Sequence, residues 1–156
     1  MDKMQAHEEA VLHRAFSIFI FNAQGKMLLQ QRADDKYHSA GLWTNACCSH
    51  PMPGEETIDA ATRRLKEELG FVTDLTYAFG FTYKSGYENG LTEHEYDHVF
   101  TGFYNGEIYS NDAEVKDWKF FSMPEIHEML RSHPGNFTTW FKIAFPKLEA
   151  YLAGIQ

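Results

Sequence analysis

The chain has 156 residues, of which 44% are hydrophobic and 23% are charged, and these values are typical of one ordinary globular domain, not of a disordered or fibrous protein. Its formal net charge is −8, from 14 Lys and Arg against 22 Asp and Glu, which would repel nucleic acid. The only two cysteines are adjacent and cannot form an ordinary disulfide, no apolar run approaches the roughly 18 residues of a spanning helix, and the N-terminus is polar. We therefore expect one cytoplasmic domain, residues 1–156, with no nucleic-acid or membrane partner.

The first third of the chain predicts a β-hairpin. Residues 14–21 are rich in Phe and Ile and read as a strand, and residues 22–25, with the sequence Asn-Ala-Gln-Gly, read as a turn. Residues 27–31 then read as the second strand. The segment 42–48 fits either a short buried strand or an extended loop.

The clearest helix covers residues 57–69. Apolar side chains recur there at helical spacing, and Gly70 follows as the expected C-cap. Arg64, Glu67 and Glu68 share a polar stripe because they are three and four residues apart. Glu67 and Glu68 suit Mg²⁺, which prefers one or two carboxylates beside phosphate oxygens and waters, although a solvated helix face would give the same pattern.

The second half of the chain predicts further strands and two helices. Residues 71–83, 96–104 and 115–121 read as strands, and Asn105-Gly106 predicts a tight hairpin turn. Ser122 and Glu125, with Pro124 between them, form a capping-box pattern that predicts the start of a helix ending near Arg131.

A last amphipathic helix contains Trp140 to Leu152, and Pro146 must start, kink or interrupt it. Mixed strands with interleaved helices predict an α/β or α+β fold.

Histidines and carboxylates indicate a metal site. Glu93 and Glu95 share one face of a strand because side chains alternate along it, although a charged strand edge exposed to solvent would give the same pattern. His7, His13 and His50 add imidazoles, and the combination suits Zn²⁺, Mn²⁺ or Fe²⁺. These residues lie far apart in the sequence, so only the fold can join them.

Residues 49–71 resemble a Nudix box, in which a glycine and a glutamate precede an R-E-U-x-E-E-x-G-U core with U apolar. Ser49 replaces the glycine, and Arg64 replaces the first glutamate of the core, which binds metal in the pyrophosphate-cleaving members. The resemblance implies a mixed β-sheet sandwiched between helices, and the Arg64 replacement argues against hydrolysis.

Residues 42–51 resemble the WTN-x-x-C-x-HP signature of the type 1 isopentenyl-diphosphate isomerases. The likeness extends from Lys3 through Trp140. It implies interconversion of isopentenyl and dimethylallyl diphosphate by protonation and deprotonation through a carbocation. Two alternatives are a Nudix pyrophosphohydrolase and a non-catalytic metal- or ligand-binding module.

The same resemblance implies the role of each residue in catalysis. Cys48, two residues before His50, is the catalytic thiol, and Glu95 is the opposing acid or base. Tyr83 matches the active-site phenol, and Trp140 matches the indole that faces the cation.

The resemblance also implies two cation sites and a diphosphate site. One Mn²⁺, Zn²⁺ or Fe²⁺ would be held by five residues: His7, His13, His50, Glu93 and Glu95. Glu68 matches the carboxylate for a Mg²⁺ that arrives with the substrate. The basic diphosphate contacts are matched by Lys3, Arg32, Lys36 and Arg64.

Overall fold

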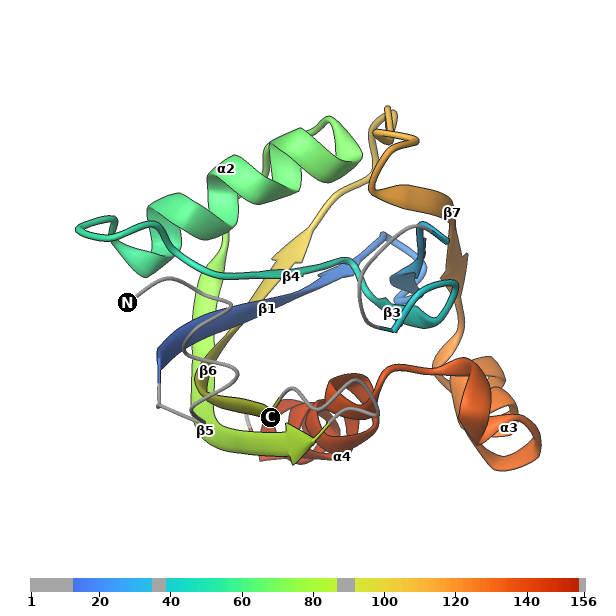
Figure 1. Ribbon diagram of the computed structural model, residues 1–156. Coiled ribbons are helices and arrows are strands. Elements are labelled where there is room, and N and C mark those ends of the chain that lie inside the picture. The colour runs from blue at the N-terminus through green and yellow to red at the C-terminus, as the bar shows by residue number, and fades with distance from the viewer. Residues whose placement is uncertain (1–12, 35–38, 87–91, 155–156) are drawn as a thin grey trace.

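The computed structural model describes residues 13–34, 39–86 and 92–154 (Figure 1). In chain order the elements are β1 (His13–Phe21), β2 (Met27–Arg32), β3 (Trp43–Asn45), β4 (Cys47–Ser49), α2 (Thr57–Leu69), β5 (Thr76–Gly86), β6 (Thr92–Phe103), β7 (Val115–Phe121), α3 (Met123–Ser132), the 3-10 helix η1 (Pro134–Asn136) and α4 (Thr139–Gly154). None of the helices in this part of the chain is both long and apolar enough to cross a membrane.

Strand β1 lies at the centre of a mixed sheet with the order β3-β2-β1-β6-β5, in which β4 pairs with β1 and β7 pairs with β2. β6 runs parallel to β1, whereas β2 and β4 run antiparallel to it. Helix α2 lies on one side of the sheet, and α3 and α4 lie on the other (Figure 1). This arrangement is the sheet between helices that the sequence predicts.

The alternation of side chains along β1 builds two cores. Phe16, Ile18 and Ile20 pack on the α2 side, and Phe19 and Phe21 pack on the α4 side. Ala15 and Ser17 precede Phe19 at the same two-residue spacing, but they are small. At Ala15 and Ser17 the α4 side of the sheet therefore carries only small side chains.

Two caps predicted from the sequence are confirmed. Gly70 adopts the left-handed conformation, with φ of 73°, and its N–H donates to Lys66 O. A Cβ at Gly70 would lie 2.4 Å from Tyr109 O, so a larger residue would force the chains apart. At α3, Ser122 and Glu125 form the predicted capping box.

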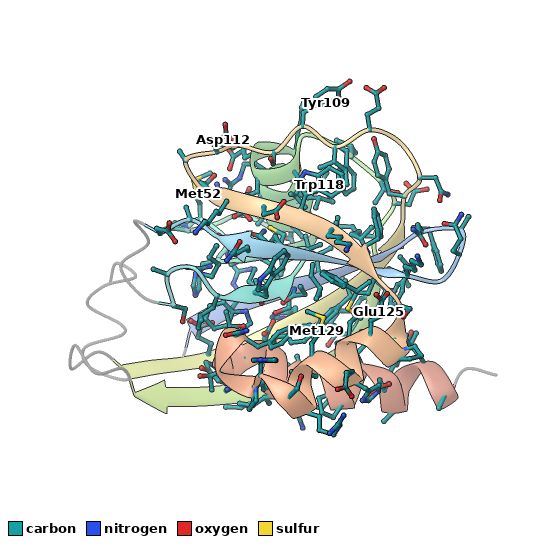
Figure 2. The ribbon with its side chains drawn as sticks, turned by 90° about the vertical axis from the view of Figure 1, so that its right-hand side faces the viewer. Met52, Tyr109, Asp112, Trp118, Glu125 and Met129 are labelled. Atoms are coloured by element: carbon teal, nitrogen blue, oxygen red, sulfur yellow. The ribbon has the colours of Figure 1, made fainter. Side chains whose placement is uncertain are left out.

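The predicted hairpin turn at Asn105-Gly106 is wrong. β6 pairs with β1 and β5, and β7 pairs with β2, so the intervening chain must cross to another part of the sheet. It passes the C-terminal end of α2, where Tyr109 N–H donates to Leu69 O (Figure 2). Pairing between distant strands thus overrides the local turn signal.

Three other predictions are corrected in detail. The strand expected from residue 71 begins at Thr76, because Phe71 stacks on Tyr104 with ring centroids 3.9 Å apart. The segment 42–48 forms two short strands, β3 and β4. Helix α4 continues through Pro146, since Phe145 and Leu148 beside that proline are buried in the core between α4 and the sheet, which we call the α4 core.

Candidate active site

A cavity opens beside Ala15 and Ser17 of β1. It contains about 420 Å³ of space free of protein atoms, including some open to solvent. Its lining consists of Ala15, Phe16, Ser17, Arg32, Cys48, Ser49, His50, Tyr83, Glu95, Asp97 and Trp140. The predicted site residues among them are Arg32, Cys48, His50, Tyr83, Glu95 and Trp140.

The two predicted proton-transfer residues come from strands on opposite edges of β1. β4 pairs with one edge and sets Cys48 opposite Ser17. β6 pairs with the other edge and sets Glu95 opposite His13. The small side chains of β1 between these strands give both residues access to the same cavity.

The Cys48 thiol has three polar neighbours. Its Sγ lies 3.0 Å from Asn45 Oδ1 and 3.6 Å from Ser17 Oγ, and the indole N–H of Trp140 donates to it at 2.9 Å. Burial, with a smaller contribution from the Asp97 carboxylate, raises the pKa of Cys48 to about 12. Cys48 is therefore a protonated thiol near neutral pH.

An imidazole and a carboxylate meet at the edge of the cavity. His50 Nε2 lies 2.7 Å from Glu95 Oε1, and Glu95 is only 5% exposed. The backbone register places His13 opposite Glu95 and Glu93 two residues before it. Strands β1, β4 and β6 thus bring four of the five predicted metal ligands to one region of the fold.

The described side chains supply only part of that predicted site. Lys3, His7 and Lys36 lie outside the described residues, as do the side chains of His13 and Glu93. Among the side chains that the structure describes, no group of three or more His, Cys, Asp or Glu could hold a metal ion.

Arg64 and Glu68 lie together outside the cavity lining. Glu68 is 5% exposed, so the solvated helix face considered as an alternative is wrong at this position. Its Oε2 accepts from Arg64 at 2.6 Å, and its Oε1 accepts from Gln30 Nε2 at 2.8 Å. Arg64 also donates to Glu67 and Glu114, and these hydrogen bonds raise its pKa although burial opposes them.

Arg32 and Trp140 meet at the cavity wall. The guanidinium carbon of Arg32 lies 5.2 Å from the centroid of the Trp140 ring, which is cation–π distance. Trp140 is 6% exposed and stands in the first turn of α4. The Trp140 ring therefore already lies against one positive charge, that of Arg32.

Sequence reasoning missed three polar residues here. Asn45 and Ser17 contact the Cys48 thiol, and Ser17 Oγ donates to Asp97 Oδ2 at 2.8 Å. Burial raises the pKa of Asp97 to about 7, with a further contribution from Glu95. Asp97 was detectable in the sequence, because it continues the alternation of Glu93 and Glu95 along one face of β6.

Comparison with known proteins identifies the family. A model of the Nudix domain matches residues 11–141. An isopentenyl-diphosphate Delta-isomerase of Pectobacterium atrosepticum is 46% identical over 151 residues, 97% of this chain and 84% of the relative. Another from Serratia proteamaculans is 47% identical over 148 residues, 95% of this chain and 83% of the relative. The chain belongs to the isopentenyl-diphosphate isomerases of the Nudix family.

Solved structures of other proteins share the fold of this isomerase-family chain. A MutT protein from Methanosarcina mazei Go1 superposes with a TM-score of 0.72 at 17% identity, covering 89% of this chain and 94% of its own. An Ap4A hydrolase from C. elegans has a TM-score of 0.65 at 22% identity, covering 91% and 98%. At these identities the likeness concerns the fold alone, and it confirms the predicted Nudix-like architecture.

Proposed function

We propose that this chain interconverts isopentenyl diphosphate and dimethylallyl diphosphate. The observation that carries the proposal is the shared cavity of Cys48 and Glu95, whose strands flank β1 on opposite edges. Moving the double bond requires one proton to be added to carbon and another removed, so two proton-transfer groups must reach one carbon skeleton. A thiol and a carboxylate in one cavity meet that requirement.

Cys48 and Glu95 have different environments, which favours separate roles. Cys48 is a protonated thiol held by Asn45 and Trp140. Glu95 is a buried carboxyl group whose Oε1 lies 2.7 Å from His50 Nε2. Tyr83 is 3% exposed and lines the same cavity, so its phenol is placed to assist proton movement and to exclude water.

The carbocation intermediate must be stabilised without being trapped. The Trp140 ring provides a π face that attracts positive charge. Phe16 and Tyr83 help to enclose the cavity, and water excluded from it cannot quench the cation to an alcohol.

The donor set around Glu95 fits a divalent transition metal. His50 and Glu95 would bind it with His7, His13 and Glu93, a mixture of imidazoles and carboxylates that suits Mn²⁺, Zn²⁺ or Fe²⁺. The close contact of His50 Nε2 with a buried Glu95 oxygen supports this assignment. Such an ion would increase the acidity of groups bound to it.

The diphosphate requires cations close to one another, although the net charge of the chain is −8. Arg32 lines the cavity, and we assign it to the diphosphate together with Lys3, Lys36 and Arg64. Glu68 is the proposed carboxylate for a Mg²⁺ that accompanies the substrate, and the ion would replace the contact of Glu68 with Arg64 or with Gln30. Arg64 occupies the position of a hydrolytic carboxylate, so the site holds the diphosphate and does not cleave it.

Product analysis tests the proposed function. The purified protein is incubated with isopentenyl diphosphate and Mg²⁺, and both the allylic product and released phosphate are measured. Formation of dimethylallyl diphosphate without phosphate release is expected. Phosphate release without isomerisation would support a pyrophosphohydrolase, and metal binding with neither product would support a non-catalytic module.

We further propose a cytoplasmic location, because Cys47 and Cys48 are both free thiols and proton transfer by Cys48 requires the reduced form.

A further inference from the structure

Asn45 is the last residue of β3, which pairs with β2, and only Ala46 separates it from β4, which pairs with β1. It is fully buried, and its side-chain amide donates to Ile18 O at 2.8 Å and to Cys47 O at 3.0 Å. Backbone carbonyls only accept hydrogen bonds, so these two contacts fix the orientation of the amide. Asn45 Oδ1 must therefore point away from them.

That oxygen faces the Cys48 thiol. Cys48 Sγ lies 3.0 Å from Asn45 Oδ1, and Thr44 Oγ1 donates to the same oxygen at 2.9 Å. The Thr44 proton is directed there because Thr138 Oγ1 already donates to the Thr44 hydroxyl at 3.0 Å. Asn45 Oδ1 is thus shared between a hydroxyl donor and the S–H donor.

The same chain of hydrogen bonds reaches helix α4. Thr138 Oγ1 accepts from Phe141 N–H in the first turn of that helix. The same turn carries Trp140, whose indole N–H donates to Cys48 Sγ. The thiol is therefore held from two directions by groups that this buried network connects.

Ser17 is the competing acceptor for the Cys48 proton, but it is less well placed. Its Oγ lies 3.6 Å from Cys48 Sγ, compared with 3.0 Å for Asn45 Oδ1. Ser17 Oγ donates its own proton to Asp97 Oδ2 and keeps its lone pairs to accept, so the distance decides between the two acceptors. We propose that Asn45 is a positioning residue that holds the Cys48 S–H bond toward its own side-chain oxygen in the resting enzyme, with Thr44 limiting how tightly it does so.

The proposal rests on the assignment of Cys48 as the catalytic thiol, but its test does not require turnover. The Raman S–H stretching band reports hydrogen bonding of a thiol directly, and Cys47→Ala leaves Cys48 as the only thiol in the chain. In that background the band is compared with the band of a protein that also carries Thr44→Val. Ser17→Ala is the matched control, because it removes the hydroxyl group of the competing acceptor.

A hydrogen-bonded S–H band is expected in the Cys47→Ala protein. Thr44→Val should move it to lower wavenumber, because Asn45 Oδ1 loses its other donor and binds the thiol more strongly. Ser17→Ala should leave it in place. Thr44→Val should also lower kcat about fivefold with KM unchanged, the scale of one hydrogen bond.

Two results would overturn the proposal. One is a band at the position of a free thiol in the Cys47→Ala protein, which needs no further variant. The other is a band that moves in Ser17→Ala and not in Thr44→Val, which would make Ser17 the acceptor. If the band behaves as expected and no variant isomerises the substrate, the positioning of the thiol stands and the proposed function fails.

Discussion

Trp140 allows the stabilisation of the cation to be separated from the positioning of the thiol. Its indole N–H donates to Cys48 Sγ at 2.9 Å, and its ring faces the cavity. Trp140→Phe keeps an aromatic face and removes the N–H donor. Trp140→Leu removes both, so the two variants differ chiefly in the π face.

The expected losses follow from those contacts. One hydrogen bond contributes about 1 kcal/mol, so Trp140→Phe should lower kcat about fivefold. A desolvated cation–π contact contributes about 2 kcal/mol, so Trp140→Leu should lower kcat by about a further 30-fold. KM should change less than kcat in both variants, because the cation exists only after the substrate has bound.

Initial rates of dimethylallyl diphosphate formation measure both effects. Trp140 also packs in the α4 core, so thermal unfolding must first show that each variant is folded at the assay temperature. Equal kcat values for the Phe and Leu variants would refute the role of the π face. Wild-type kcat in the Phe variant would refute a contribution from the hydrogen bond.

Three further predictions concern the metal, the diphosphate and a buried carboxyl group. His50→Ala should reduce the transition-metal content of the purified protein, and elemental analysis that finds equal content would reject the assigned ligand. Arg64→Glu should raise KM for isopentenyl diphosphate, and unchanged KM and kcat would remove Arg64 from the diphosphate site. Burial raises the pKa of Asp97 from 3.8 to about 7. Between these two pH values the folded protein keeps a proton that the unfolded chain has lost, so the stability of the folded protein falls as pH rises. Asp97→Asn should therefore gain in Tm relative to the wild type from about pH 4 to about pH 7 in metal-free protein, and a difference in Tm that does not vary with pH would contradict this.

Local patterns correctly predicted α2 with its C-cap and α3 with its capping box. The apolar spacing of residues 57–69 predicted the bounds of α2, and the capping box predicted the start of α3. Each of these signals consists of residues that are close neighbours in the sequence. The Asn105-Gly106 turn failed because the partner of β7 is β2, a strand that lies far away in the sequence. Local signals carry no information on such pairing.

Site residues that belong to a motif were predictable from the sequence. Residues that only position another side chain were less predictable. The resemblance implied Cys48, whereas residue type and strand alternation had already made His50 and Glu95 candidates. The fold brings the three together by placing β4 and β6 on opposite edges of β1. Asn45 belongs to the signature at residues 42–51, but the signature alone gives it no role. Its contact with Cys48 depends on the passage of the chain from β3 to β4, which the sequence did not resolve into two strands.

Deuterium incorporation tests the central claim most directly, since Cys48 and Glu95 are proposed to exchange protons with the carbon skeleton of the substrate. In D₂O, the product and the recovered substrate should acquire deuterium at carbon. Cys48→Ala or Glu95→Gln should lower isomerisation by at least about 10²-fold, the lower range for general acid–base catalysis, while the neighbouring Cys47→Ala stays active. Full activity in Cys48→Ala, or isomerisation in D₂O with no deuterium in the product, would contradict the account.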